Sequence, residues 1–316
     1  MLMLNIGLMV EKEAPFSRDE AIYKGSLMHG LFECAVSDYS VGLWQALRRT
    51  PHEKALYALI PPQDRATSYP AGHRFSLGVM LFGAAVPLWQ DVLDALMSSR
   101  RLGLGQAATP LVVLSASLHH PNHPAQTHLQ AVSARNPLPL STAPVAVPKP
   151  QPTDRLVLEL LSPTQINSQA RREAPLPLTL SSVVKSLQQR LSALEPALAT
   201  QFEFESEAWQ QQVRAFWPHQ IAASHSVQHR PWVHQSRNTP GPMVKQAIVG
   251  SMAFDGPIAA PILSLLELGQ WLAIGQSCSM GQGWYALRCP VPVAIQPPTL
   301  LFAAIQAAQA FAKEPA

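Results

Sequence analysis

The chain has 316 residues, a length that fits one or two domains. Hydrophobic residues make up 47% of it, which is enough for a full core, whereas 14% of the residues are charged and the formal net charge is +3. Strong nucleic-acid binders often have a more basic balance, so this charge argues neither for nor against RNA binding. Any RNA-binding residues would have to be concentrated on one face.

The sequence favours a protein of the cytoplasm. The three cysteines, Cys34, Cys278 and Cys289, form no CxxC pair and are odd in number, which fits a reducing compartment. The apolar segment 1–10 is too short to span a bilayer and lacks the basic start of a signal peptide. No nucleotide-binding Walker loop, zinc ribbon or serine-hydrolase elbow is present, so we expect no cofactor. No run of 18 or more apolar residues appears, so we expect no membrane partner.

Proline divides the sequence. Eight of the thirty prolines fall between Pro121 and Pro152, and proline interrupts the hydrogen-bond ladders of helices and strands. We therefore predict a linker at 119–152. It separates an N-terminal domain at 1–118 from a C-terminal domain at 153–290, and a tail follows at 291–316.

The sequence of the first half predicts six elements in the order strand, helix, strand, strand, helix, strand. The first helix starts at Ser17, with Glu20 three residues on as in a capping box, and its predicted buried stripe follows. The second strand ends at a proline pair, and the third alternates apolar and polar residues. The stripe is Ile22, Leu27, Leu31 and Phe32; the other elements are strands at 2–10, 55–60, 74–82 and 110–114 and a helix at 87–97.

The second half repeats this order with one insertion. It predicts strands at 155–161, 224–235, 244–254 and 283–289, helices at 179–194 and 261–268, and a helical insertion at 195–216. The region 300–310 is Ala-rich and predicts a further helix. Two βαββαβ units in tandem indicate an α+β protein with two ferredoxin-like (RRM-like) domains.

Three glycines, Gly275, Gly281 and Gly283, bracket a loop between the last helix and the last strand. Glycine allows positive φ angles, and N–H groups in such a loop can face phosphate oxygens. Because glycine-rich turns are common, this pattern alone is equally consistent with an ordinary turn.

The context of this loop resembles a known family. A helix that ends in LLELG at 265–269, followed by IGQSCSMGQGWYAL at 274–287, resembles the CRISPR-associated repeat-RNA-processing endoribonucleases of the RAMP superfamily, the sixth Cas family. The segments 158–164, 187–194, 249–256 and 69–72 are similar at the level of pattern. Where the family often has a basic residue after the first glycine and an aromatic one before the second, this chain has Gln276 and Met280.

The resemblance implies an activity and its partners. Family members cut CRISPR precursor transcripts within their repeats without a metal: the 2′-hydroxyl attacks the adjacent phosphate and leaves a 2′,3′-cyclic phosphate and a 5′-hydroxyl. The implied partner is CRISPR repeat RNA, as a stem-loop or a single strand, and other subunits of a CRISPR interference complex are further candidates. The product would be mature guide RNA.

Such a reaction needs proton transfer and positive charge, which histidine and lysine or arginine supply. The family commonly places a catalytic histidine or tyrosine on its first helix, so His29 is our first candidate. Tyr23 and Lys24, which precede it on the same predicted helix, are further candidate catalytic residues, and Tyr23 could orient the base. His52, in a basic loop after that helix, is the runner-up. A partly buried structural histidine is the alternative interpretation of His29.

Paired arginines suit the RNA backbone because the guanidinium forms forked hydrogen bonds with phosphate. We expect the stem to be recognised by shape and backbone with few base contacts. An ordinary solvated surface pair is the alternative for each arginine. The predicted RNA-binding residues are Arg171, Arg172, Arg230, Arg237, Lys245, Gly275, Gln276, Ser277, Gly281 and Gly283.

Other interpretations stay open. His119, His120, His123 and His128 have a spacing like that of metal ligands, but no cysteine or carboxylate lies nearby in the sequence, and we predict no metal site. The chain can also be a non-catalytic RNA-binding RAMP subunit of an interference complex. A third class is a double ferredoxin-like protein that binds a protein or a small ligand.

Overall fold

The computed structural model describes most of the chain, in two compact units. The first unit comprises Met1–Val145 together with Ser279–Gly281, and the second comprises Ala146–Cys278 and Gln282–Ala316. The described residues are 1–17, 20, 23–48, 54–98, 103–105, 108–121, 123–129, 145–166, 178–216, 221–229, 232–234, 243–245 and 247–298.

The first unit is built on an antiparallel sheet. Its central strand β1 (Leu2–Val10) pairs with β5 (Arg74–Leu81) on one side and β7 (Thr109–His120) on the other. β3 (Tyr57–Ile60) pairs with the outer side of β5, so the order of the four main strands is β3-β5-β1-β7. The shorter strands are β6 (Gly103–Leu104) and β8 (His123–Leu129), which pair with β7, and β2 (Ala14–Pro15) and β4 (Ser68–Tyr69), which pair with each other.

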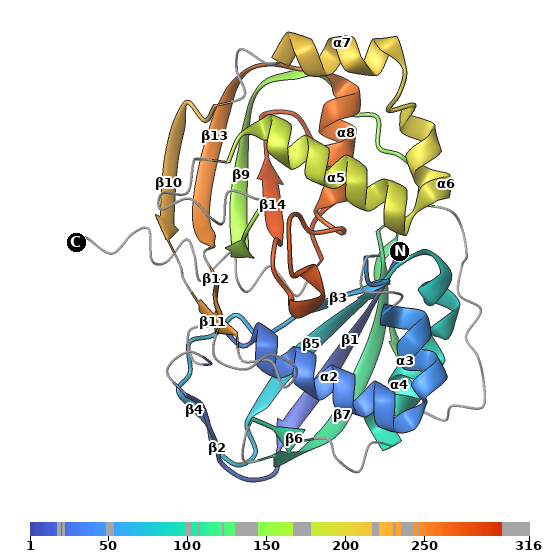
Figure 1. Cartoon of the computed structure of the whole chain (residues 1–316), viewed down its shortest axis with the longest axis vertical. Coiled ribbons are helices and arrows are strands. Elements are labelled where there is room, and N and C mark those ends of the chain that lie inside the picture. Colours follow the sequence, from blue (N-terminus) through green and yellow to red (C-terminus); the bar gives the residue numbers. More distant parts are fainter. Residues whose placement is uncertain are drawn as a thin grey trace. The chain divides into compact units, whose positions relative to one another are not determined.

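Helices cover one face of this sheet (Figure 1). They are α2 (Gly25–Tyr39), α3 (Val41–Arg48) and α4 (Trp89–Ser98), the last preceded by the 3-10 helix η1 (Gly83–Leu88). Leu31 and Phe32 of α2 are buried, as the predicted apolar stripe requires. The fold thus places α2 beside β3, and these two elements carry the candidate site described below.

The predicted capping box forms. The backbone N–H of Ser17 donates to Glu20 Oε2 at 2.8 Å, and that of Glu20 donates to Ser17 Oγ at 3.3 Å. The helix that carries the rest of the predicted stripe begins later, at Gly25, after a turn at Lys24. Ile22 of that stripe lies outside the described residues.

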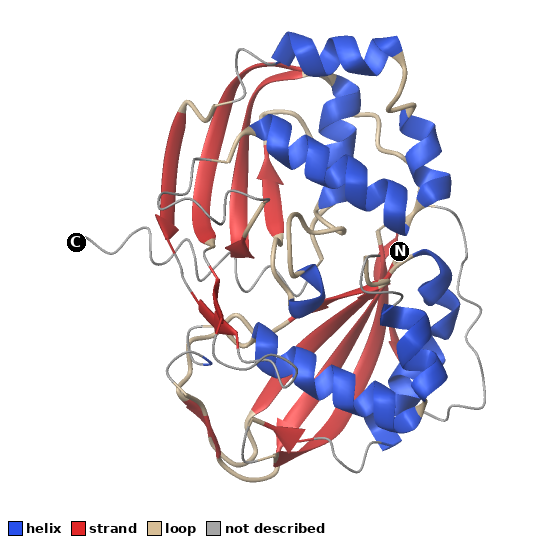
Figure 2. Cartoon of the chain, viewed as in Figure 1, coloured by secondary structure: helices blue, strands red, loops and turns tan. Residues whose placement is uncertain are grey.

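The second unit repeats the architecture, with helices on one face of a four-stranded sheet (Figure 2). The strand order is β10-β13-β9-β14, and all three pairings are antiparallel. The strands are β9 (Thr153–Thr164), β10 (Ser224–His229), β13 (Ile248–Ile258) and β14 (Tyr285–Arg288), with β11 (Trp232–His234) and β12 (Met243–Lys245) as a separate pair; the helices are α5 (Leu180–Leu194), α6 (Pro196–Ala199), η3 (Thr200–Phe202), α7 (Glu207–Phe216), α8 (Ala260–Gly269) and η5 (Cys278–Met280).

Both sheets have the ferredoxin-like strand order, in which the first strand lies between the third and the fourth. The predicted α+β class with tandem ferredoxin-like domains is therefore confirmed. The predicted helical insertion is also present, as α6, η3 and α7.

The structure differs from the sequence prediction at the start of the proline-rich segment. β7 continues to His120, and β8 covers part of the predicted linker and includes Pro124. β8 pairs with β7 at the border of the sheet, and proline is tolerated on such an edge strand because the missing N–H is not needed for a second ladder.

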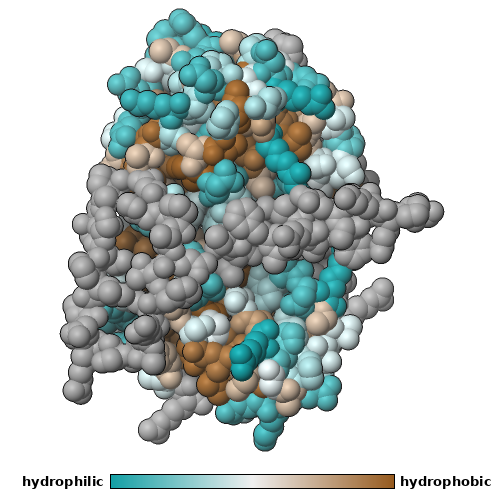
Figure 3. Space-filling view, turned by 180° about the vertical axis from the view of Figure 1, so that it is seen from behind, coloured by the Kyte–Doolittle hydropathy of each residue, from teal (hydrophilic) through white to brown (hydrophobic). Residues whose placement is uncertain are grey.

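No helix in the described part of the chain is long and apolar enough to cross a membrane. In the view from behind, apolar and hydrophilic atoms both reach the surface of each unit (Figure 3).

Candidate active site

His29 lies on α2 and faces Tyr57 of β3. Its Nδ1 is 3.3 Å from Tyr57 Oη, within hydrogen-bond distance, and the two rings are nearly parallel, with centroids 6.2 Å apart. Phe32, three residues further along α2, packs against the same tyrosine with ring centroids 4.8 Å apart. The packing of α2 on β3 thus fixes the imidazole, whose side chain keeps 17% of its surface exposed.

The second imidazole nitrogen faces a carboxylate. His29 Nε2 is 3.9 Å from Glu33 Oε2, one helical turn away, and Glu33 is 39% exposed. The carboxylate is thus placed to pair with the ring whenever the imidazole is charged. A group that must both accept and release a proton benefits from such a partner.

Tyr57 stays protonated. Burial is the main cause that raises the pKa of its phenol, and the negative charge of Glu33 raises the pKa further; the charge of Arg48 and a hydrogen bond from Ser279 oppose the shift without reversing it. A neutral phenol can donate to Nδ1 or accept from it. Tyr57 can therefore support His29 in either protonation state.

The segment Ser279–Gly281 belongs to the first unit and packs on its helix and strand. Tyr23 Oη donates to the carbonyl of Met280 at 2.7 Å. A Cβ added at Gly25 would lie 2.2 Å from that carbonyl oxygen, so the close approach requires glycine there. The contact places Tyr23 as a residue that positions the loop.

Lys24 is fully buried, and protein oxygens surround its ammonium group. Nζ donates to Asp64 Oδ1 at 2.8 Å, to the Asp64 carbonyl at 3.2 Å and to the Ala66 carbonyl at 3.2 Å. These three bonds use all three donors of the ammonium group. The structure thus shows Lys24 bonded within the fold, and its predicted catalytic role stays a prediction.

Three backbone donors of the glycine-rich loop bond within the fold. The N–H groups of Gly275, Gln276 and Gly283 donate to Ser186 Oγ at 2.9 Å, Gln165 O at 2.8 Å and Pro163 O at 3.1 Å. These three donors are used within the fold, and the predicted contact of the loop with RNA stays a prediction. The loop folds back on the end of β9 and on α5, which satisfies its backbone internally.

Several predicted residues cannot be placed. His52, Arg171, Arg172, Arg230 and Arg237 lie outside the described residues, and Lys245 is described only as backbone in β12. Ser277 has a positive φ of 55°, and Gly281 follows η5 with a φ of 84°.

Of the histidines considered as metal ligands, His119 is buried and its Nε2 lies 3.1 Å from Ser117 Oγ. The side chains of His123 and His128 are outside the described part of the structure.

Sequence reasoning missed the partners of His29. Tyr57 sits in a short apolar strand and gives no sign of a polar role, and Ser279, which hydrogen-bonds Tyr57, lies 222 positions from that tyrosine. Glu33 could have been found, because a residue four positions after a helical histidine shares its face. Arg48 lies at the end of α3, and its Cζ is 5.9 Å from the centroid of the Trp44 ring. Its positive charge lowers the pKa of the Tyr57 phenol.

A comparison with models of protein families found a match within the C-terminal part of the chain. Residues 158–285 match the family model of the CRISPR-associated endoribonuclease Cas6. The predicted resemblance to the Cas6 family is confirmed. The matched segment begins in β9 and ends at the start of β14, so it includes the glycine-rich loop of this Cas6-like chain.

Solved Cas6 structures share the fold. A Cas6 (TTHB231) product complex is 18% identical, covers 91% of this chain and 99% of its own, and has a TM-score of 0.58. Thermus thermophilus Cas6 (TTHB231) is 17% identical with a TM-score of 0.55 and covers 91% of this chain and 98% of its own. A Cas6 (TTHA0078) product complex is 17% identical, with a TM-score of 0.50 and coverage of 91% and 100%. A comparison of the sequence with curated proteins found no significant match.

Proposed function

We propose that the chain is an endoribonuclease that cuts CRISPR precursor transcripts within their repeats to release mature guide RNA. The observation that carries this proposal is the arrangement of His29 and Tyr57 in the first unit of a Cas6-like fold. The proposed chemistry is attack of the 2′-hydroxyl on the neighbouring phosphate, without a metal, to give a 2′,3′-cyclic phosphate.

In this mechanism His29 moves protons at Nε2. It takes the proton from the 2′-hydroxyl or gives one to the leaving 5′-oxygen, and a positioned acid or base of this kind contributes roughly 10²- to 10⁴-fold. Tyr57 holds Nδ1 at 3.3 Å, which fixes the direction of Nε2. The Glu33 carboxylate stabilises the imidazolium formed when the ring takes a proton.

Positive charge for the phosphorane would come from Arg48. Its guanidinium is close enough to Tyr57 to act on the phenol electrostatically, and it belongs to an exposed residue. An arginine near a developing phosphorane stabilises the transition state more than the ground state. Tyr23 and Lys24 contribute by positioning the loop and the start of α2.

The proposed partner is CRISPR repeat RNA, as a stem-loop or a single strand, in the cytoplasm. Two of the similar solved proteins are described as Cas6 product complexes, which supports a nucleic-acid product for this chain as well. Arg171, Arg172, Arg230, Arg237 and Lys245 remain the proposed phosphate contacts. Other subunits of an interference complex are proposed further partners.

A cleavage assay in EDTA tests the proposal. A CRISPR repeat RNA is incubated with the purified chain, and the 3′ end of the upstream product is treated with phosphatase before and after acid opening. We expect one cut per repeat and a 3′ end that resists phosphatase until acid opens the cyclic phosphate. Cleavage that requires an added divalent ion, or a phosphatase-sensitive end from the start, would contradict the mechanism.

The non-catalytic RAMP subunit is the alternative function. The internal bonding of Lys24 and of the loop N–H groups is compatible with it, because these groups have hydrogen-bond partners within the fold. Retention of repeat RNA by a folded sample that gives no product would select this alternative. Failure to retain RNA even at low salt, where phosphate contacts are strongest, would select a protein or small-ligand binder instead.

A further inference from the structure

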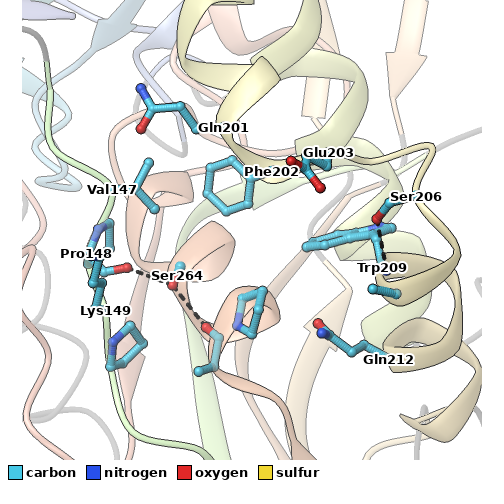
Figure 4. A pocket seen from close by; sticks show the side chains of 14 residues that line it. Val147, Pro148, Lys149, Gln201, Phe202, Glu203, Ser206, Trp209, Gln212 and Ser264 are labelled. Carbon is cyan, nitrogen blue, oxygen red and sulfur yellow. Dashed lines mark hydrogen bonds between the residues drawn. The ribbon is translucent and has the colours of Figure 1, made fainter.

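The second unit contains a cavity of about 350 Å³ that the proposed function does not use. It lies between the segment 147–150 that leads to β9, the start of α8, and the insertion η3–α7 (Figure 4). Its volume is within the range of about 300–1,000 Å³ that is typical of small-ligand sites. Ser264 Oγ donates to the Pro148 carbonyl at 2.7 Å and holds one wall in place.

Two polar groups in this cavity have no partner among the residues that the structure describes. They are the indole N–H of Trp209, a residue that is 2% exposed, and the buried side-chain carbonyl oxygen Oε1 of Gln212. Both residues line the cavity and stand three positions apart on α7, so they share one side of the helix. In Figure 4 the amide end of Gln212 extends from α7 toward the cavity.

Unpartnered buried polar groups are costly, and native proteins rarely keep them without a reason. Here a donor and an acceptor stand on the same wall, so the complement is a ligand that presents an acceptor beside a donor. The edge of every nucleobase does this with a ring nitrogen or carbonyl oxygen next to an N–H or amino group.

The other walls suit a flat heterocycle. Phe202 is buried and its ring meets that of Trp209 edge-on, with centroids 6.1 Å apart, while Val147 and Pro148 close the opposite side. Aromatic side chains are the common surface on which bases stack. Lys149 and Glu203 are exposed lining residues and supply, respectively, a cation for a phosphate and an acceptor for an amino group.

We propose that this cavity, lined by Trp209, Gln212 and Phe202, is a nucleobase-binding site. The base comes either from a free nucleotide or from an unpaired position of an RNA. The site shares no residue with the His29 cluster, and the inference does not depend on cleavage.

Titration calorimetry tests the site directly. The full chain is titrated with AMP, GMP, CMP and UMP, and with ribose 5-phosphate as the ligand that lacks a base. We expect at least one nucleotide to bind saturably and about tenfold or more tighter than ribose 5-phosphate, since two hydrogen bonds and stacking are lost with the base. Equal binding of ribose 5-phosphate, or no binding of any nucleotide, would overturn the proposal.

Variants separate the cavity from the rest of the surface. Trp209→Phe keeps the aromatic ring and removes the donor, and Gln212→Leu removes the acceptor; each should weaken nucleotide binding about fivefold or more. Gln211→Ala, on the exposed side of α7, is the matched control and should leave it unchanged. Wild-type affinity in Gln212→Leu would refute the site even if Trp209→Phe failed to fold.

A short unpaired oligonucleotide distinguishes the two sources of the base. A gain in affinity over the free nucleotide that disappears in Trp209→Phe or Gln212→Leu assigns the site to RNA, whereas equal affinities assign it to the free nucleotide. Both results support a nucleobase site. Mononucleotide binding is measured without cleavage, so the two proposals are tested independently. Absence of nucleotide binding would not contradict the proposed endoribonuclease function, and absence of cleavage would not contradict the nucleobase site.

Discussion

At the scale of single residues, the phenol of Tyr57 is the group that directs His29. We predict that Tyr57→Phe lowers the single-turnover cleavage rate by about 10- to 100-fold, because the imidazole loses the bond that orients it. Binding of repeat RNA, measured by filter retention, should not change. Tyr39→Phe, at the exposed end of α2, is the control and should cleave normally. Equal rates for the two variants would remove Tyr57 from the mechanism.

The buried carboxyl of Glu267 makes the stability of the fold depend on pH. This buried carboxyl accepts from the N–H groups of Ala294 and Ile295 through Oε2, while its Oε1 has no partner among the described residues. Burial is the dominant cause and raises the pKa of Glu267 above its ordinary 4.5, against the lowering effect of the two N–H groups. The folded state therefore binds the proton more tightly than the unfolded state, and stability falls as pH rises above about 4.5.

Glu267→Gln should remove this loss. Because the amide carries no charge, we expect the variant to be more stable than the wild type at pH 7, by about 1 kcal/mol, and to lose that advantage in acid. Urea unfolding at several pH values measures the difference. Glu205→Gln, at an exposed position, is the control. The stability of Glu267→Gln is compared with that of the wild type at each pH. If the advantage of the variant were smaller at pH 7 than at pH 4, the assigned upward shift of the Glu267 pKa would be contradicted.

At the scale of elements, close backbone contacts require glycine in the glycine-rich loop. Gly283 and Gly72 both have positive φ, at 81° and 80°, but a Cβ at Gly283 would lie 1.8 Å from the Ile274 carbonyl oxygen and one at Gly72 would meet nothing within 4 Å. Gly72→Ala should cost only the backbone strain of about 1–2 kcal/mol. Gly283→Ala should cost roughly 1–3 kcal/mol more through overpacking. Chemical denaturation compares the pair, and equal costs would show that the loop relaxes around the methyl group.

The elements themselves were largely predictable, because each carries a local signal. The alternation of β5, the stripe of α5 with Thr179 as its N-cap, and the capping box at Ser17 all depend on residues within a few positions of one another. β8 was not predicted, because its proline and its mixed composition hide a strand that has a ladder on one side only.

The candidate site was less predictable than the elements that carry it. His29 was proposed from a family resemblance, but its contact with Tyr57 joins a helix to a strand 28 positions away. The bonding of Lys24 to Asp64 likewise depends on how loops meet, which no local pattern encodes. The glycine loop was recognised correctly as a special turn, yet its donors proved to be used by β9 and α5.

At the scale of the whole molecule, two ferredoxin-like units have the same strand order. The first unit brings His29, Tyr57 and Ser279 together, and the second carries the segment matched by the Cas6 family and the cavity on α7. Tandem βαββαβ order was readable from the sequence because it follows from the succession of elements alone. The proposed domain limits at 118 and 153 remain a proposal beside the division at Val145.

In the proposed reaction, the imidazole of His29 carries out the proton transfer of RNA cleavage. Single-turnover cleavage of the repeat RNA in EDTA is measured for His29→Ala beside filter binding of the same RNA, with His225→Ala on the exposed strand β10 as the control. We expect a rate at least about 100-fold below that of the wild type with unchanged RNA affinity, and a normal rate for the control. Cleavage by a folded His29→Ala variant at the wild-type rate would contradict this role of His29.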